Sequence, residues 1–292
     1  MSPFELIRAE AASYPVMRLC ELLGVSRSGY YEWRERQTET PPPPPHERLS
    51  AKLRAFHIVS NGTYGVRRMH RELLADGERV GRRLVRRLMR QNGPITVQAR
   101  RFRKTTDSDH ALGYSPNLLN QDFYMPSPNR AWVSDITYVW TAEGWCYLAV
   151  ILDLCSRRVV GWAIDSHMKA ELCERALSRA LSTRGPVKGL ILHSDRGSQY
   201  AARSYRRIVI RHGLRQSMSD AGNCYDNAVA ESFFATLKKE CVHLQPFATR
   251  TEAYDAIERY INDFYNPRRR HSALGYISPM EFEATLRTSE AA

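Results

Sequence analysis

The segment from Ala131 to Met218 limits the possible folds more than any other part of the chain. Three runs rich in β-branched and aromatic residues follow one another at 131–140, 145–153 and 158–164, separated by short turns. Helical and strand patterns then alternate at 169–182, 189–193, 201–212 and 214–218. Antiparallel strands followed by such alternation predict a mixed sheet with helices on its faces, which is an α/β fold.

Three acidic residues in this segment and in the helix that follows it predict the chemistry of the chain. Asp135 lies inside the strand run WVSDITYV, Asp195 follows an apolar run in LILHSDRGSQY, and Glu231 lies on the apolar-periodic helix of DNAVAESFFATLKKE. An acid within a strand pattern fits strand propensity poorly, and such departures tend to mark functional sites. Carboxylates that converge from separate elements suit divalent metals and phosphoryl transfer. Each acid alone also fits a turn, a cap or a solvated helix face.

These segments resemble the catalytic domain of DDE transposases and retroviral integrases. A narrower similarity covers nearly the whole chain: HSDRGSQY, SDAGNCYDNAVAESFFATLKKE and YNPRRRHSALGYISPMEF resemble the second-reading-frame (OrfB) proteins of a large bacterial insertion-sequence family. The resemblance implies an RNase H-like catalytic domain preceded by small all-α helix-turn-helix modules. Retroviral integrases carry a zinc module with closely spaced cysteines, which this chain lacks, so the bacterial branch fits better.

The resemblance also implies roles for individual residues. Asp135, Asp195 and Glu231 correspond to the catalytic acids that hold the metal, expected to be two Mg²⁺ or Mn²⁺ ions. Lys238, seven positions after Glu231, corresponds to a basic residue that we expect on the same helix face, next to a DNA phosphate. The implied reaction is in-line attack on a DNA phosphodiester, first by water and then by a DNA 3′-hydroxyl. Positioning and charge neutralisation would then replace a protein nucleophile.

The positive charge of the chain independently predicts a nucleic-acid partner. The net charge is +12 and the excess is mostly arginine, whose planar fork suits phosphate geometry. Nine arginines lie between Gly65 and Asn92, which exceeds the usual imbalance of a solvated helix face. Beside Lys238, the predicted DNA contacts are Arg67, Arg68, Arg82, Arg83, Arg86, Arg87, Arg90, Arg268, Arg269 and Arg270.

Breaks in the pattern predict six segments. Residues 1–40 fit a helix-turn-helix or an ordinary helical hairpin, with Ser26 as a helix cap, and the prolines at 41–45 form a stiff linker. Residues 46–93 form a basic helix-turn-helix-like module with helices at 65–75 and 81–91, and 94–129 are a second linker. The catalytic core spans 130–245. A helical, basic tail at 246–292 completes it, with capping boxes at Thr249/Glu252 and Ser278/Glu281.

Several other polar residues fit structural roles better than chemical ones. Asp153 and Asp220 are assigned to turns and loops, His193 and His271 to structure rather than to general-base catalysis, and Asp226 and Asn227 to helix capping. The six cysteines have no disulfide or zinc-site spacing, and no signal peptide or membrane-spanning run is visible. We therefore expect a cytoplasmic, nucleoid-associated bacterial protein with free thiols.

The predicted function is a transposase that cleaves and joins DNA strands. Its expected partners are double-stranded DNA at the element ends and the target, and further copies of the chain in a synaptic complex. An upstream-frame (OrfA-type) protein, or a frameshift fusion to one, is a further expected partner because the chain has no sustained heptads. Two alternatives are a catalytically inert DNA-binding regulator and a stand-alone RNase H-like nuclease. The nuclease would leave both basic helical modules unexplained.

Overall fold

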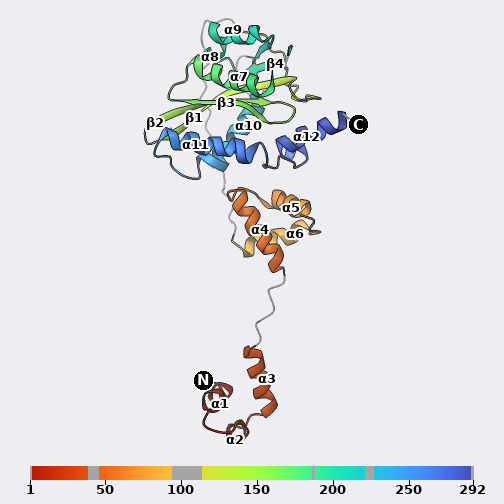
Figure 1. Ribbon diagram of the computed structural model, residues 1–292, viewed down its shortest axis with the longest axis vertical. Coiled ribbons are helices and arrows are strands. Elements are labelled where there is room, and N and C mark those ends of the chain that lie inside the picture. The colour runs from red at the N-terminus through yellow and green to blue at the C-terminus, as the bar shows by residue number, and fades with distance from the viewer. Residues whose placement is uncertain (1, 39–45, 94–113, 186–187, 221–226, 291–292) are drawn as a thin grey trace. The chain divides into compact units, whose positions relative to one another are not determined.

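The computed structural model describes residues 2–38, 46–93, 114–185, 188–220 and 227–290 (Figure 1). These residues form two compact units, 1–51 and 52–292. The five consecutive prolines and most of the second predicted linker lie outside the described residues. In the described part of the chain, no helix is long and apolar enough to span a membrane.

The first unit contains a small helical cluster formed by α1 (Pro3–Glu10), α2 (Val16–Leu22) and α3 (Arg27–Thr38). Its core consists of Ile7, Cys20 and Tyr30. Gly24 takes a positive φ of 65° in the turn between α2 and α3, a conformation that favours glycine. The Ser26 hydroxyl accepts the Gly29 N–H at 3.1 Å, which confirms the predicted cap.

The second unit begins with a helical module of three helices. These are α4, which begins at Glu47 in the first unit and ends at Val59, α5 (Val66–Ala75) and α6 (Arg82–Gln91). The helices α5 and α6 match the sequence prediction to within a residue, whereas α4 was not predicted. Met69 and Leu73 of α5 are buried, as are Val85, Leu88 and Met89 of α6. This apolar packing leaves the arginine-rich face of α6 exposed.

A five-stranded mixed sheet forms the centre of the second unit, with strand order β3-β2-β1-β4-β5. The strands are β1 (Ala131–Thr141), β2 (Gly144–Asp153), β3 (Val159–Asp165), β4 (Ile191–Ser194) and β5 (Arg215–Met218). The first three pair antiparallel, and β4 and β5 pair parallel to β1 and β4. This confirms the predicted mixed sheet and α/β fold class.

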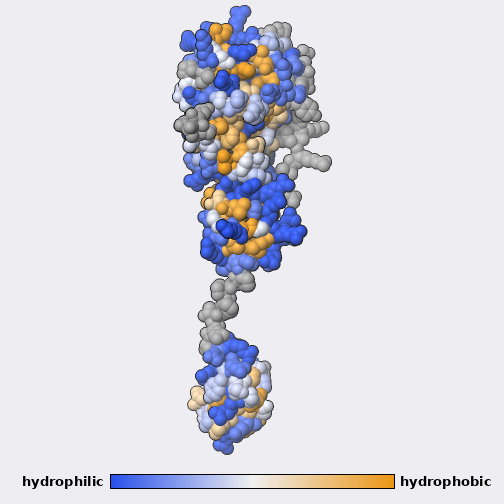
Figure 2. Space-filling view, turned by 90° about the vertical axis from the view of Figure 1, so that its right-hand side faces the viewer, coloured by the Kyte–Doolittle hydropathy of each residue, from blue (hydrophilic) through white to orange (hydrophobic). Residues whose placement is uncertain are grey.

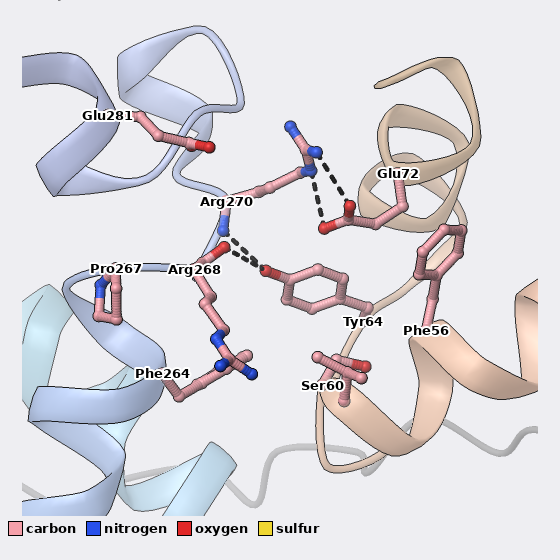
Figure 3. Close-up of a pocket in the computed structure, with 10 residues that line it drawn as sticks. Phe56, Ser60, Tyr64, Glu72, Phe264, Pro267, Arg268, Arg270 and Glu281 are labelled. Atoms are coloured by element: carbon pink, nitrogen blue, oxygen red, sulfur yellow. Dashed lines mark hydrogen bonds and ion pairs between the residues drawn. The ribbon is translucent and has the colours of Figure 1, made fainter. Parts of the chain in front are cut away.

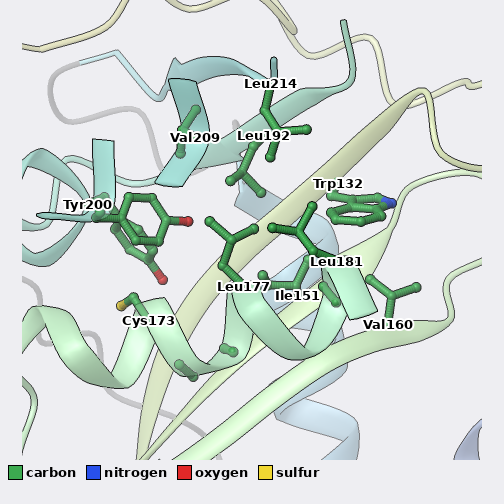
Figure 4. Close-up of a cluster of buried hydrophobic side chains, with 14 of the residues drawn as sticks. Trp132, Ile151, Val160, Cys173, Leu177, Leu181, Leu192, Tyr200, Val209 and Leu214 are labelled. Atoms are coloured by element: carbon green, nitrogen blue, oxygen red, sulfur yellow. The ribbon is translucent and has the colours of Figure 1, made fainter. Parts of the chain in front are cut away.

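Helices cover both faces of this sheet (Figure 1). One layer contains α7 (Ala170–Arg184), α8 (Ser198–Ala201) and α9 (Arg203–Arg211), and the other contains α10 (Ala228–Leu237) and α11 (Arg250–Arg259). The predicted helix at 201–212 is interrupted because Ala202 is extended, with ψ of 140°. The first layer buries Trp132, Leu177 and Leu192 in the main core (Figure 4).

Gly161 determines how closely α7 can approach the sheet. A Cβ atom at this position of β3 would lie 2.3 Å from the Ala176 carbonyl oxygen and 2.7 Å from the Ala180 Cβ. Only glycine therefore fits where β3 and α7 are in contact.

The C-terminal part of the chain packs against the sheet through a buried charge cluster. After the π-helical segments Lys238–Val242 and Tyr260–Tyr265 and a 3₁₀ turn at Ser272–Leu274, α12 (Pro279–Glu290) places Glu283 in the interior, 3% exposed. The Glu283 carboxylate accepts hydrogen bonds from the Ser156 hydroxyl at 2.6 Å and the Arg158 Nη1 at 2.8 Å, and it pairs with Arg184. Burial alone would raise the Glu283 pKa, but these donors outweigh burial and lower it.

Replacing Glu283 with glutamine should destabilise the second unit by about 3 kcal/mol. The substitution leaves two half-buried guanidinium groups close together without their shared counter-charge, and breaking a buried ion pair costs roughly 3–5 kcal/mol. Urea unfolding followed by circular dichroism measures the change. A loss below about 1 kcal/mol would show that water screens the cluster.

The predicted structural roles of several other polar residues are confirmed. Asp153 is fully buried, and its carboxylate accepts the N–H groups of Asn129, Cys155 and Ser156 at 2.7–3.0 Å. Its Oδ1 is therefore occupied by the turn before β3, and its Oδ2 by the backbone just before β1. Each cysteine that the structure describes is a free thiol, whereas Cys224 lies outside the described residues.

Both predicted capping boxes lie at helix starts. At α12 the Ser278 hydroxyl accepts the Glu281 N–H at 3.2 Å while the Glu281 carboxylate accepts the Ser278 N–H at 2.8 Å. At α11 the Thr249 hydroxyl accepts the Glu252 N–H at 3.1 Å, but the Glu252 carboxylate accepts the N–H of Ala248 rather than that of Thr249. The first box is therefore complete and the second is a variant of it.

Candidate active site

Asp135 and Asp195 come together because their strands are parallel neighbours in register. Ser134 of β1 pairs with Ser194 of β4, and this is the last residue pair between the two strands. Asp135 and Asp195 each follow directly, at the carboxyl end of this pairing. Since neighbouring strands lie about 4.8 Å apart, both carboxylates project from the same small region. The pairing of β1 with β4 therefore brings these two aspartates together.

The surroundings of Asp135 disfavour its negative charge. Burial raises its pKa well above the ordinary range, and the charge of Asp195 raises it further, with a smaller contribution from Glu231. The Ile136 N–H, donated to Asp135 Oδ1 at 2.7 Å, and the charge of Lys238 act in the opposite direction but do not cancel these effects. A cation beside two carboxylates this close would favour the ionised form of both.

Glu231 lies on the first turn of α10 with its side chain exposed. Its charge is felt at Asp135, so it lies near the aspartate pair. Among the residues that the structure describes, no group of three His, Cys, Asp or Glu side chains is close enough to hold one metal ion. The fold therefore brings two of the three predicted acids together, and Glu231 faces them from the covering helix.

Lys238 lies on the protein side of this site. It is the first residue of the π-helical turn after α10, only 6% exposed, and its Nζ lies 4.9 Å from the centre of the Tyr138 ring. Burial lowers its pKa, and the charge of Asp135 opposes this effect. In this arrangement Lys238 balances part of the charge of the aspartates, and its contact with DNA remains a prediction.

Asn227 is a candidate site residue that the sequence reasoning assigned only to capping. It is the residue before α10, but its side chain makes no capping hydrogen bond. Its Oδ1 is buried and has no hydrogen-bond partner among the residues that the structure describes, and the residue is 5% exposed. It precedes Glu231 by four residues, about one helical turn, so helical spacing could have placed it on the same face. Asp226, the other predicted cap, lies outside the described residues.

The two histidines considered as general bases both lie in structural surroundings. His193 is fully buried in β4, with its two ring nitrogens 2.8 Å and 3.2 Å from the hydroxyls of Ser217 and Ser219. His271 is surrounded by arginines: burial, followed by the charges of Arg269 and Arg157, lowers its pKa to about 4. These placements agree with the structural roles predicted for them.

The predicted DNA-contact arginines fall into two groups. Seven have exposed side chains: Arg67 of α5, five residues on α6 and Arg268 in the tail. The residues on α6 are Arg82, Arg83, Arg86, Arg87 and Arg90. Hydrophilic residues cover much of the visible face of the helical module in the space-filling view (Figure 2). These seven side chains are accessible, and their contact with DNA phosphates stays a prediction.

The other three arginines are occupied inside the second unit. Arg269 is 3% exposed, and its Nε and Nη2 donate to the two carboxylate oxygens of Glu240 at 2.6 Å and 2.7 Å. Arg68 Nη1 donates to the same carboxylate at 3.3 Å. Arg270 pairs with Glu72 of α5 (Figure 3). The structure thus directs these three guanidinium groups toward protein carboxylates and not toward a DNA surface.

Comparisons with known proteins identify the family of the core and of the helical module. The family profile described as "Integrase core domain" matches residues 126–224, a second profile with the same description matches 212–279, and "HTH-like domain" matches 45–102. The chain is 47% identical over 264 residues to the "Insertion element IS600 uncharacterized 31 kDa protein" of Shigella sonnei, covering 90% of this chain and 97% of that protein. It is 40% identical over 281 residues to "Transposase InsF for insertion sequence IS3A" of Escherichia coli (strain K12), covering 96% and 98%. This chain belongs to the insertion-sequence transposases.

The transposase therefore has an integrase-type catalytic core with an RNase H-like α/β fold and an HTH-like module before it, as predicted. It is an enzyme of the polynucleotidyl transferase type, and cores of this type depend in general on a divalent metal. A solved HTLV-2 integrase catalytic core in complex with magnesium aligns with a TM-score of 0.41 and 14% identity, covering 55% of this chain and 99% of that one. That likeness is too distant to define the transposase's site.

Proposed function

We propose that Asp135, Asp195 and Glu231 form the centre at which this transposase cleaves a DNA strand and joins it to a target. The observation that carries this assignment is the Asp135–Asp195 pair, which the parallel register of β1 and β4 places at one end of the sheet. Glu231 reaches the same region from α10, and its charge is felt at Asp135. Metal ions held by such a cluster would stabilise both the attacking oxygen and the leaving oxygen of the phosphodiester.

The donor set fits a hard divalent cation, for which we propose Mg²⁺ or Mn²⁺ and a pair of ions. Asp135 and Asp195 offer carboxylate oxygens, and burial together with the charge of Asp195 raises the pKa of Asp135, so a bound cation would stabilise its anion. Asp135 and Asp195 would hold the metal together, and Glu231 would complete its ligands on the exposed side. When bound, the metal supplies Lewis acidity and neutralises charge at the phosphodiester.

The protein side chains have distinct roles in this scheme. Asp135 and Asp195 are fixed by strand pairing, so the position of the reacting phosphate is fixed with them. Glu231 is exposed and can approach the DNA strand directly. The buried Lys238 compensates part of the charge of the Asp135 carboxylate. Water, and afterwards a DNA 3′-hydroxyl, are the nucleophiles, so no covalent bond to the protein is needed.

We propose that the exposed arginines hold double-stranded DNA beside this centre. Arg67 and the five arginines of α6 are exposed on the HTH-like module, and Arg268 adds an exposed charge from the tail. Arginine is suited to this role because its charge persists at every working pH and its fork matches phosphate oxygens. A transposase that processes two DNA ends together needs more than one active site, so we propose a homo-oligomer. We also propose an upstream-frame partner or fusion, because the chain has no sustained heptads.

Replacing Glu231 with glutamine tests the proposed site. We expect joined products of a labelled duplex carrying the terminal sequence of the element to fall at least about a hundredfold, because one oxygen ligand and its charge are removed. DNA binding, measured by gel shift, should remain within about twofold.

Glu171→Gln serves as the matched control for this experiment. Glu171 is also an exposed glutamate in the first turn of a helix, but α7 lies on the opposite face of the sheet. We expect that variant to join DNA at the wild-type rate. If Glu231→Gln loses DNA binding together with joining, Glu231 is chiefly structural and the assignment is wrong.

A further inference from the structure

The helical module is held on the C-terminal tail of the core by a small polar contact, formed by Tyr64, Glu72 and Arg270, which we call the clasp (Figure 3). The Arg270 Nε lies 2.8 Å from Glu72 Oε1, and its Nη2 donates to Glu72 Oε2 at 2.9 Å. The Arg270 backbone N–H donates to the Tyr64 hydroxyl at 2.7 Å. One guanidinium thus lies within ion-pair distance of both carboxylate oxygens, and its Nη2 supplies the hydrogen bond.

Tyr64 is built to make this contact. Its side chain is 2% exposed, and burial raises its pKa to about 12, so its hydroxyl remains protonated and can donate to the Arg268 carbonyl oxygen at 3.4 Å. The ring packs against Phe264 with centroids 6.1 Å apart. One tyrosine of the module therefore contacts three residues of a single tail segment.

The contact between the module and the tail also encloses a space. A cavity of about 280 Å³ lies between the module and the tail, lined among others by Phe56, Val59 and Pro267. Where such a space separates two elements, the groups that do touch determine their relative position. The ion pair of Arg68 with Glu240, at 3.3 Å, is the second connection of this kind.

A continuous series of contacts links the DNA-facing helix α6 to the catalytic helix α10. Helix α6 packs on α5, which bears Glu72, and the clasp fixes α5 to the tail. In the tail, Tyr265 packs edge to face on Phe233 of α10 with ring centroids 4.9 Å apart. Phe233 follows Glu231 by two residues. A change at the clasp therefore alters where α6 lies relative to the carboxylates.

We propose that Tyr64, Glu72 and Arg270 are positioning residues that fix the number of base pairs between the DNA that α6 grips and the phosphodiester that is cut. The proposal rests on the proposed function of the carboxylates and of the α6 arginines. The helical module and the core are consecutive segments of one chain. A direct contact between them, such as the clasp, holds them at a constant distance. The clasp provides that contact without touching the reacting atoms.

The test compares the wild-type chain with Glu72→Arg, Arg270→Glu and the double variant in which both charges are exchanged. The substrate is an end-labelled duplex carrying the terminal sequence of the element, and cut positions are mapped at single-nucleotide resolution. We expect the wild type to cut mainly at one phosphate. Each single variant should spread its cuts over several phosphates and lower the share of the main product about tenfold, and the exchange should restore most of it.

Two further variants separate positioning from folding. Tyr64→Phe removes only the hydroxyl and retains the ring packing, so it should spread the cuts while its melting temperature stays within a few degrees of wild type. Glu78→Arg removes the ion pair of Glu78 with Lys52, which joins two parts of the helical module, and should leave the cut position unchanged. Loss of stability alone would affect Glu78→Arg as well.

Each outcome decides the proposal. Spread cuts in the single variants that return to one phosphate in the exchanged double variant support it. Single variants that cut at the wild-type phosphate, or a double variant that restores nothing, overturn it while the proposed function stands. A wild-type chain that cuts no DNA contradicts the proposed function, and the role given to the clasp fails with it.

Discussion

Replacing Asp135 with asparagine should reduce strand cleavage at least about a thousandfold and make the metal-free protein more resistant to heat. The loss of activity follows from removing one anionic ligand of a centre whose charge stabilisation is worth several kcal/mol. The gain in stability follows because the anion of Asp135 is disfavoured by burial and by Asp195. Removing one of two neighbouring negative charges relieves the cost of their repulsion. We expect a rise of a few degrees in the melting temperature.

The pH dependence of stability checks the same prediction. A carboxyl whose pKa is raised in the folded state binds more protons when folded, so the folded state is favoured at low pH. The metal-free wild type should lose stability as pH rises from about the ordinary aspartate value of 3.8 toward the raised pKa of Asp135. Asp135→Asn should flatten this decline. Melting curves in EDTA between pH 4 and 8 measure it.

Divalent metal should reverse the order of the two proteins. The wild type should gain stability in millimolar Mg²⁺ or Mn²⁺ because the cation binds only the folded carboxylate pair. The asparagine variant should gain much less. A variant that is less stable than wild type in EDTA, or that retains cleavage, would show that Asp135 supports the fold and not the chemistry.

Replacing Arg83, Arg86 and Arg90 of α6 with glutamine should weaken DNA binding about a hundredfold at 0.15 M salt. These three side chains are exposed on one helix that packs on α5 through its other face. Each phosphate contact contributes a slope of about 0.9 to the dependence of log affinity on log salt, so the slope should fall by about 2.7. Fluorescence anisotropy with a labelled duplex at several salt concentrations gives both values.

A triple variant of α9 provides the charge-matched control. Arg203, Arg207 and Arg211 are also three exposed arginines on one helix, and α9 belongs to the layer over the sheet. Their replacement by glutamine removes the same net charge. We expect it to change the salt slope by less than about 1. Equal effects of the two triple variants would mean that overall charge, and not the face of α6, attracts DNA.

Strong local patterns made much of the fold predictable. Hydrophobic periodicity located α5, α6 and α7 and each of the five strands, because apolar side chains must repeat with the period of the element that buries them. Turn and cap residues such as Gly24 and Ser278 set several boundaries correctly. Periodicity missed α4, whose apolar pattern is weak, and most of α8, and it began α9 two residues early.

The sequence by itself determined the element types, the family and the three acids as candidates, because these are written in local periodicity and in ordered motifs. The tertiary structure decided which residues meet. Parallel pairing of β1 with β4 placed Asp135 beside Asp195, across 59 residues of chain, and a contact between strands so far apart forms only when the whole sheet assembles. Packing likewise paired Arg269 with Glu240 and Arg270 with Glu72 rather than leaving them at the surface. A run of arginines specifies positive charge, but only the folded chain decides which of those arginines forms an ion pair with a buried carboxylate.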